Sequence, residues 1–340
     1  EIEKALGADA DVFSIYYNVT AAGNWEHGKN ILLRHETDDA TAKKISLSVS
    51  ELKNKVDAGK AKLMKIRDAR VKPGLDDKVL SSWNALMISG YVDAYRAFGD
   101  EAFLSKAITN AEFLLKHAIA KDGEMTRNYK NGKSSIKALL DDYAFTIAAF
   151  IDLYQATFNE KWLNEANTLT AYTIEHFFDP KSKMFFYTHN KHSNLISRKM
   201  EVADNVIPSS NSEMAKNLFL LGHFFYNEDY ISKAKQMLIN VADDVQKNIY
   251  FYANWGILEA WLTKPLYEVA ITGDDFKNKR QEFDQHYLPD VILLGGKTES
   301  KLALLENKLI AAKTTIYVCR DKTCKLPVME VGQALRQIGK

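Results

Sequence analysis

The chain has 340 residues, and 46% of them are hydrophobic, so it can form one large core or a large and a small domain. It carries 45 Lys and Arg against 44 Asp and Glu, a net charge of +1, which argues against a nucleic-acid partner and against attraction to an acidic membrane. The sequence contains no run of about 18 apolar residues, so we expect no transmembrane helix. The two cysteines argue against a disulfide framework and fit a reducing compartment, and Glu1–Lys4 does not resemble a signal peptide, so we expect a cytoplasmic protein.

The first part of the chain gives few structural signals. We expect residues 1–40 to be the end of a structure that begins upstream, and 45–70 to form an outer helix. The chain is therefore expected to lack its natural N-terminus.

A repeat of about sixty residues organises the middle of the chain. Tyr95–Phe103 aligns with Tyr154–Trp162 at an offset of 59 residues, and Phe158–Trp162 aligns with Tyr226–Tyr230 at an offset of 68. Each copy is predicted to form a helix, a short polar turn and a second helix.

The two helices of each copy differ in kind. The first is apolar almost all round, as in 144–154 and 214–225, which is typical of a helix buried on all sides. The second is amphipathic, as in 101–119 and 229–247. Buried helices that alternate with half-buried ones predict a mainly α (α/α)6 toroid, an inner ring of helices within an outer ring. The predicted inner helices lie at about 79–98, 142–157, 210–226 and 250–263. A closed toroid of this class needs six, so we expect the first hairpins to be missing.

Short strands are predicted between the helical pairs. Residues 124–130 and 133–137 flank Asn131-Gly132, the signal of a tight hairpin turn. Residues 183–189 and 195–201 alternate in the same way.

The pattern changes after Pro265. Residues 267–272, 291–294 and 314–319 are predicted as buried strands, and helices are expected near 275–287 and 329–338. We therefore predict toroid hairpins over 1–264 and a small α/β appendage over 265–340.

Polar and aromatic residues gather where the inner helices begin. All inner helices of a toroid run the same way, so these residues are expected around one opening, where carboxylates, amides and rings suit a polyhydroxylated ligand. The candidate catalytic residues are Asp76, Asp77, Asp142 and Asp204. The candidate substrate-binding residues are Trp83, Asn84, Arg127, Asp141, Tyr143, Tyr187, Arg198, Ser209, Asn211, Ser212, Asn254 and Trp255.

A structural role competes with each of these assignments. Asp, Ser and Asn are preferred helix caps, and capping is the more frequent role for any one of them. A surface ion pair is as frequent a role for Arg127 and Arg198. The set as a whole still favours a site, because it supplies more polar groups than caps use.

The histidines and cysteines point to no known site. None of the eight histidines begins an inner helix, and His223 has the setting of a hydrogen-bonded core residue. Cys319 and Cys324 are spaced too widely for a thioredoxin motif and lack the further ligands of a zinc site. We predict no metal and no cofactor.

Five segments, in this order, resemble one family: Gly23–Asn30, Lys72–Met87, Leu140–Phe145, Ile207–Ser212 and Tyr317–Cys324. The chain resembles the C-terminal two-thirds of the YyaL-type proteins, which include the spermatogenesis-associated thioredoxin-like proteins. The resemblance implies an upstream thioredoxin-like domain as partner, and a toroid similar to that of N-acylglucosamine 2-epimerases and six-hairpin glycosidases. The family usually has Gly where this chain has Ser210.

Two functions from different classes remain open. The first is a carbohydrate-binding or carbohydrate-processing site, in which two of the four candidate Asp residues act as acid and base and a sugar is the ligand. An epimerase that abstracts a proton would instead favour a His at the opening. The second is a non-catalytic scaffold that holds a peptide or a partner domain.

Overall fold

The computed structural model describes residues 1–191 and 196–340. Packing divides the chain into two compact units, Glu1–Asp76 and Asp77–Lys340. The helical hairpins and the α/β appendage both belong to the second unit. The predicted boundary at 264/265 therefore lies within one compact unit, where the hairpins are followed by the α/β appendage.

The first unit is a small helical body with its own core. Residues 1–40 contain short helices and an irregular stretch between them. Its elements are α1 (Ile2–Leu6), the short 3₁₀ turns η1 (Gly7–Asp9) and η2 (Glu26–Gly28), α2 (Ala10–Tyr16), α3 (Asp38–Lys44) and α4 (Val49–Asp68). Helix α4 is the predicted 45–70 helix; a reciprocal capping box between Ser48 and Glu51 starts it. Its Leu52 and Val56 are buried in the unit's core.

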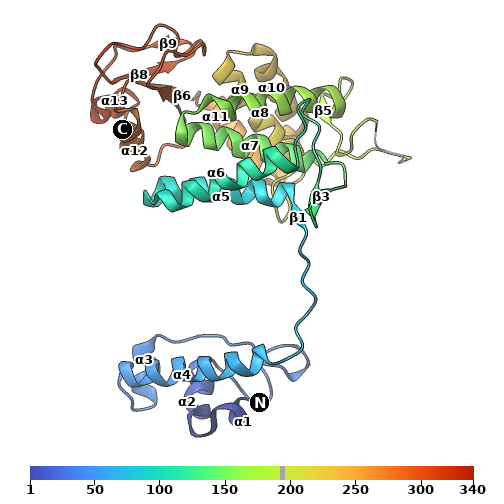
Figure 1. Cartoon of the computed structure of the whole chain (residues 1–340), viewed down its shortest axis with the longest axis vertical. Helices are drawn as coiled ribbons and strands as arrows, with labels where there is room; N and C mark the ends of the chain where they lie inside the picture. The colour runs from blue at the N-terminus through green and yellow to red at the C-terminus, as the bar shows by residue number, and fades with distance from the viewer. Residues whose placement is uncertain (192–195) are drawn as a thin grey trace. The chain divides into compact units, whose positions relative to one another are not determined.

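The second unit contains three helical hairpins and a seventh helix (Figure 1). The four predicted inner helices are confirmed as α5 (Ser81–Phe98), α7 (Leu140–Thr157), α9 (Ser210–Phe225) and α11 (Ala253–Thr263), the last preceded by η3 (Ile249–Phe251). The outer helices are α6 (Glu101–His117), α8 (Glu160–Phe177) and α10 (Glu228–Lys247). Neighbouring inner helices pack in the order α5, α7, α9, α11, and α6, α8 and α10 each pack on their own partner. The class is therefore mainly α, with four inner helices as an arc of an α/α toroid.

The sequence repeat has a physical cause in the hairpin turns. In each copy the inner helix ends with a residue of positive φ, and the next residue caps the outer helix with its side chain. The positive-φ residues are Gly99, Phe158 and Tyr226. The capping residues are Asp100, Asn159 and Asn227.

Short antiparallel strands connect the hairpins. In the first sheet, β2 (Asn128–Lys130) pairs with both β1 (Val79–Leu80) and β3 (Lys133–Ser134). The predicted turn between β2 and β3 is confirmed: Asn131 and Gly132 both have positive φ, as a two-residue turn of this kind requires. In the second sheet, β5 (Met184–Phe185) pairs with β4 (Phe178–Asp179).

The strand expected over 195–201 is not present in its described part. It begins with Leu195, which lies outside the described residues. Over 196–201 the chain is irregular, and a main-chain hydrogen bond, from the N of Tyr187 to the carbonyl of Lys199 (2.8 Å), connects it to the segment after β5.

The appendage is a four-stranded sheet with two helices. Strand β6 (Tyr267–Thr272) runs parallel to β7 (Val291–Gly296) and antiparallel to β8 (Thr315–Arg320), and β9 (Thr323–Cys324) pairs with β8. Along β6 the side chains alternate: Ala270 packs in the core of the hairpins, whereas Val269 and Ile271 share a second core. That second core also contains residues of the two helices, α12 (Phe276–Asp284) and α13 (Val331–Gln337).

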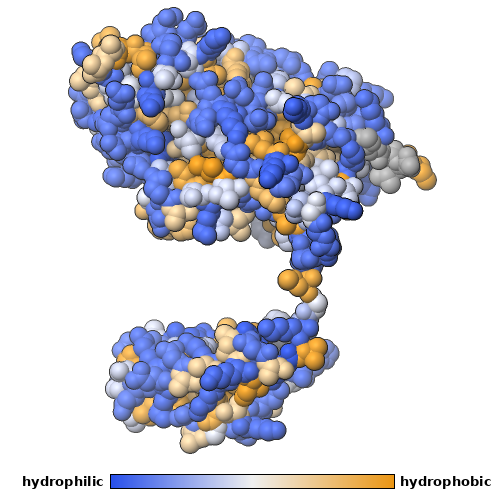
Figure 2. All heavy atoms as spheres, viewed as in Figure 1, coloured by the Kyte–Doolittle hydropathy of each residue, from blue (hydrophilic) through white to orange (hydrophobic). Residues whose placement is uncertain are grey.

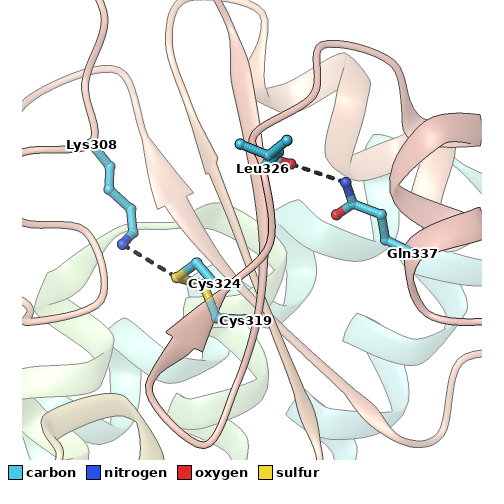
Figure 3. The surroundings of a disulfide bond; sticks show 5 residues. All are labelled: Lys308, Cys319, Cys324, Leu326 and Gln337. Carbon is cyan, nitrogen blue, oxygen red and sulfur yellow. Dashed lines mark hydrogen bonds between the residues drawn. A yellow bond between two sulfur atoms is a disulfide. The ribbon is translucent and has the colours of Figure 1, made fainter.

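One disulfide joins Cys319 and Cys324 (Figure 3). The two cysteines, which were expected to fit a reducing compartment, are therefore paired in this structure. The two residues lie directly opposite each other in the antiparallel pairing of β8 and β9. Their spacing in sequence is that of a two-residue hairpin turn, at Asp321-Lys322, rather than that of a redox motif or a zinc site. The ammonium group of Lys308 lies 3.6 Å from the sulfur of Cys324.

Hydrophilic residues cover most of the visible face of each unit (Figure 2). Over residues 1–191 and 196–340, no helix is both long and apolar enough to cross a membrane.

Candidate functional site

The start of α7 is held by a buried carboxylate. Asp142 is fully buried and accepts hydrogen bonds from the main-chain N of Ser82 and of Leu139, both 3.0 Å, and from Arg127 (2.8 Å). Arg127 also bonds Asp141 (2.9 Å). Burial raises the pKa of Asp142 to about 6 and the charge of Asp141 adds to this, whereas Arg127 and the main-chain donors oppose it. The carboxylate thus connects the starts of α5 and α7.

A second carboxylate connects the starts of α9 and α11. Asp204 accepts hydrogen bonds from the main-chain N of Ser209 (2.9 Å), the hydroxyl of Ser212 (3.0 Å) and the main-chain N of Asn254 (2.8 Å). Ser209 is itself the cap of α9, because its hydroxyl accepts from the main-chain N of Ser212 (3.2 Å). These four candidate residues therefore lie together, and their bonds fix the ends of two helices.

Three other candidates are buried in the core. Asn211 holds both main-chain groups of Phe185, at 2.8 and 2.9 Å. Trp255 is 0% exposed and donates its indole N–H to a main-chain carbonyl, and Tyr143 is 1% exposed and accepts from a main-chain N–H. Neither ring has a face that a ligand can reach in this structure. Trp255 and Tyr143 are therefore not placed to stack on a sugar.

Trp83 differs from those two rings, because it is 66% exposed at the start of α5. The amide of Asn84, next to it, donates to the carbonyl of Leu80 (2.8 Å), which starts the same helix. Burial and the charge of Asp141 raise the pKa of Tyr187. Trp83 is therefore the most exposed of the candidate aromatic rings, and Tyr187 is half-buried.

The remaining candidates lie in loops. Arg198 bonds the carbonyl of Thr188 (3.0 Å) and lies over the ring of Phe186. Asp77 forms an ion pair with Lys130, and Asp76 is the last residue of the first unit. Among the described residues, Asp142 and Asp204 share no hydrogen-bond partner.

A cavity lies farther along the same helices. It has a volume of about 360 Å³, and α5, α7, α9 and α11 line it together with the segments around Leu266 and Leu288–Ile292. Trp261 provides its aromatic wall. Its polar lining consists of Ser89, Arg96, Asp152, Gln155, Glu213, Lys216 and Asn217.

Two carboxylates of this cavity have contrasting surroundings. Asp152 accepts one hydrogen bond, from the hydroxyl of Ser89 (2.7 Å). Burial raises the pKa of Asp152 to about 6; the Ser89 bond opposes this, and nearby negative charges, that of Glu213 among them, add to it. Glu213 instead accepts hydrogen bonds from the ammonium group of Lys216 (3.1 Å) and from the amide of Asn254 (2.9 Å). One carboxyl group therefore retains a proton more readily than an ordinary Asp, and the other faces a cation.

The sequence analysis did not select these cavity residues. Asp152 lies within the apolar run 144–154, and Lys216 and Asn217 lie within 214–225. Charged side chains are rarely buried unless they are paired or functional, so a charge inside a helix that is otherwise apolar all round is the signal that indicates them.

Metal binding has no support in the described residues. Within residues 1–191 and 196–340, no three His, Cys, Asp or Glu side chains are grouped so as to hold an ion.

Comparison with curated proteins finds the expected relatives. The chain is 26% identical to spermatogenesis-associated protein 20 of Mus musculus over 325 residues, 89% of this chain and 41% of that protein. It is 26% identical to the Homo sapiens protein of the same name, over 93% of this chain and 44% of the other. An uncharacterised Caenorhabditis elegans protein is 27% identical, over 97% and 49%. The resemblance to spermatogenesis-associated proteins is thus confirmed, and the chain spans less than half the length of these relatives. No family model matches it.

Three solved structures to which the chain is similar have the names of sugar enzymes. A cellobiose 2-epimerase from Bacillus thermoamylovorans is 17% identical with a TM-score of 0.42, over 50% of this chain and 45% of that one. A GH76 α-mannanase from Bacteroides thetaiotaomicron is 17% identical with a TM-score of 0.44, over 71% and 69%. A D-mannose isomerase has a TM-score of 0.40 at 15% identity, over 48% and 40%. Likenesses this weak do not identify a substrate or a site.

Proposed function

We propose that the chain carries a carbohydrate-directed active site in the cavity between its inner helices, with Asp152 and Glu213 as its acid and its base. The observation that supports this most is the contrast between the two carboxyl groups. Burial raises the pKa of Asp152 to about 6, whereas Glu213 receives the ammonium group of Lys216. Two carboxyl groups in opposite environments are what acid–base cleavage of a glycosidic bond requires.

The charges of the cavity favour a neutral ligand. Its two carboxylates are matched by two cations, and each cation already has an anionic partner: Lys216 bonds Glu213, and Arg96 bonds Asp284 (2.7 Å). No cation in the cavity lining is therefore left to attract a phosphate or a uronic acid. A volume of about 360 Å³ lies at the small end of the range for ligand pockets and suits a sugar unit.

The amides of the cavity can bind hydroxyl groups. Asn217 uses its amide N–H to bond the carbonyl of Ala144 (2.7 Å), so its oxygen is available to accept from a ligand. Gln155 uses its oxygen to accept from the main-chain N of Leu293 (3.1 Å), so its N–H groups are available to donate. The ring of Trp261 would cover the C–H face of the sugar.

In the proposed reaction Asp152 donates its proton to the leaving oxygen of the sugar. Glu213 acts on the opposite side, either as a base on water or as a nucleophile at the anomeric carbon. The candidate residues Asp142 and Asp204 keep the inner helices in place in this scheme, and Trp83 remains a surface on which a longer saccharide would stack.

The test combines binding and turnover of neutral saccharides. Thermal shift and calorimetry with mono- and disaccharides identify a ligand, and chromatography of the products detects cleavage or epimerisation. D152N and E213Q are each expected to lower turnover at least about a hundredfold while binding persists, because general acid or base catalysis contributes this much. D229N, which changes an exposed carboxylate on α10, is the matched control.

Each other outcome is informative. Saccharide binding without turnover would favour the alternative, a binding module. If no saccharide raises the melting temperature and none is converted, the proposal is wrong. The cytoplasmic location and the thioredoxin-like partner domain stay predictions.

A further inference from the structure

A second pocket lies on the other side of Trp261 from the sugar cavity. It has a volume of about 280 Å³ and is bounded by α9, α10, α11, the start of β6 and the turn at Asp321-Lys322. Most of its wall is apolar. The apolar residues are Phe219, Tyr226, Ile231, Trp261, Leu262 and Pro265.

A buried histidine–carboxylate pair lies in this wall. Glu268 is 2% exposed, and its Oε1 lies 2.8 Å from Nδ1 of His223. Its other oxygen, Oε2, is buried and has no hydrogen-bond donor among the described residues, and none of their lysines or arginines forms an ion pair with it. A buried carboxylate without a cation is costly, so this position favours an added positive charge.

The other charges of the pocket do not supply that cation. Lys322 bonds Glu228 (2.5 Å) and lies 5.1 Å from the centre of the Tyr226 ring. The remaining charged groups of the lining are Lys235 on α10 and Asp321 of the turn, which have opposite charges. With His223 neutral, three carboxylates face two ammonium groups, and the carboxylate in excess is the buried one.

We propose that this pocket binds an organic ammonium ion with an apolar body. The ammonium group supplies the donor that Glu268 lacks. The apolar body lies against Phe219, Tyr226 and Trp261, whose rings also attract a cation. This pocket shares Trp261 with the proposed sugar site, but Asp152 and Glu213 do not line it.

A proton on His223 is the competing source of positive charge. An imidazolium beside Glu268 would neutralise the carboxylate in the empty pocket, and the incoming ammonium would displace that proton. The remaining titratable neighbours are Tyr226, Glu228, Lys235, Asp321 and Lys322, and none of them contacts Glu268 in an ion pair.

The first experiment compares two probes of equal shape. Phenethylamine and 2-phenylethanol differ only in an ammonium group against a hydroxyl group. Calorimetry on the full chain is expected to show at least tenfold tighter binding of the amine than of the alcohol. Equal affinity for both probes, or tighter binding of the alcohol, would overturn the proposal.

Two variants locate the site. E268Q keeps the shape of the side chain and is expected to weaken the amine at least tenfold. L262W fills the pocket without changing the pair and is expected to abolish binding, so the test remains valid if E268Q folds poorly. D243N, an exposed change on α10, is the matched control. Wild-type amine binding in both E268Q and L262W would place the amine elsewhere and refute the assignment.

Discussion

The starts of the inner helices and the cavity farther along them use the same residue types in opposite ways. At the helix starts, Asp142 and Asp204 each accept three hydrogen bonds from the protein. In the cavity, Asp152 accepts one. A polar group whose bonds are all made to its own chain stabilises the fold, whereas one with bonds to spare is available to a ligand. For these three aspartates, the number of hydrogen bonds accepted from the chain separates the helix starts from the cavity, whereas the residue type does not.

The largest expected effect separates the two tryptophans of the predicted site. W255A removes a ring that is 0% exposed and should cost about 3–5 kcal/mol of unfolding free energy, because it leaves a large void. W83A removes a ring that is 66% exposed and should stay within about 0.5 kcal/mol. Urea unfolding followed by circular dichroism measures both. Similar costs for the two variants would contradict the assignment of Trp255 to the core.

The two carboxylates of α7 should respond in the same contrasting way. D142A leaves two main-chain N–H groups without an acceptor and Arg127 with Asp141 alone. We expect D142A to lower the free energy of unfolding by about 2–3 kcal/mol. This is less than the cost of breaking a fully buried ion pair, because Arg127 is 24% exposed. D152N should cost nearly nothing, since the amide oxygen still accepts from Ser89. If D152N destabilises the protein as much as D142A does, both carboxylates belong to the framework.

The pH dependence of stability tests the surroundings of Asp152 in a second way. Asp152 has a pKa of about 6 in the folded protein against an ordinary value of 3.8, so the folded state holds this proton more tightly than the unfolded chain. Ionisation of Asp152 therefore lowers the free energy of unfolding as the pH rises from about 4 to about 6. D152N lacks this term, and its stability relative to the wild type should increase over that interval. Urea titrations of both proteins at several pH values test this; a constant difference would mean that Asp152 has an ordinary pKa.

The helices were predictable because each leaves a local signal. The bounds of α5, α7, α9 and α11 follow from apolar runs that end at turn residues, and Asn131-Gly132 alone indicates its hairpin. The strands of the appendage are equally visible as short apolar runs after Pro265. Each of these signals depends only on residues that are close together in the chain, so it can be recognised without knowing the fold.

The site was less predictable because it depends on which groups remain unsatisfied. Residue type does not distinguish Asp142, whose bonds go to Ser82 and Arg127, from Asp152, which has one bond. The disulfide between Cys319 and Cys324 has the same origin, since it follows from the pairing of two strands. In each case the deciding contact joins different elements of the fold.

Phe158 shows that the hairpins and the appendage cannot be exchanged separately. This residue ends α7 with a positive φ, which is unfavourable for a bulky side chain, and its ring stacks on Phe276 at 5.6 Å in the core beyond the sheet. A Cβ added at Gly295 would lie 3.0 Å from that ring and 1.9 Å from the carbonyl oxygen of Ile271, so only glycine admits the close approach. A chimera joined near residue 264 would leave this ring without its socket. We therefore expect the hairpins and the appendage to be transferred to another protein only together, as residues 77–340.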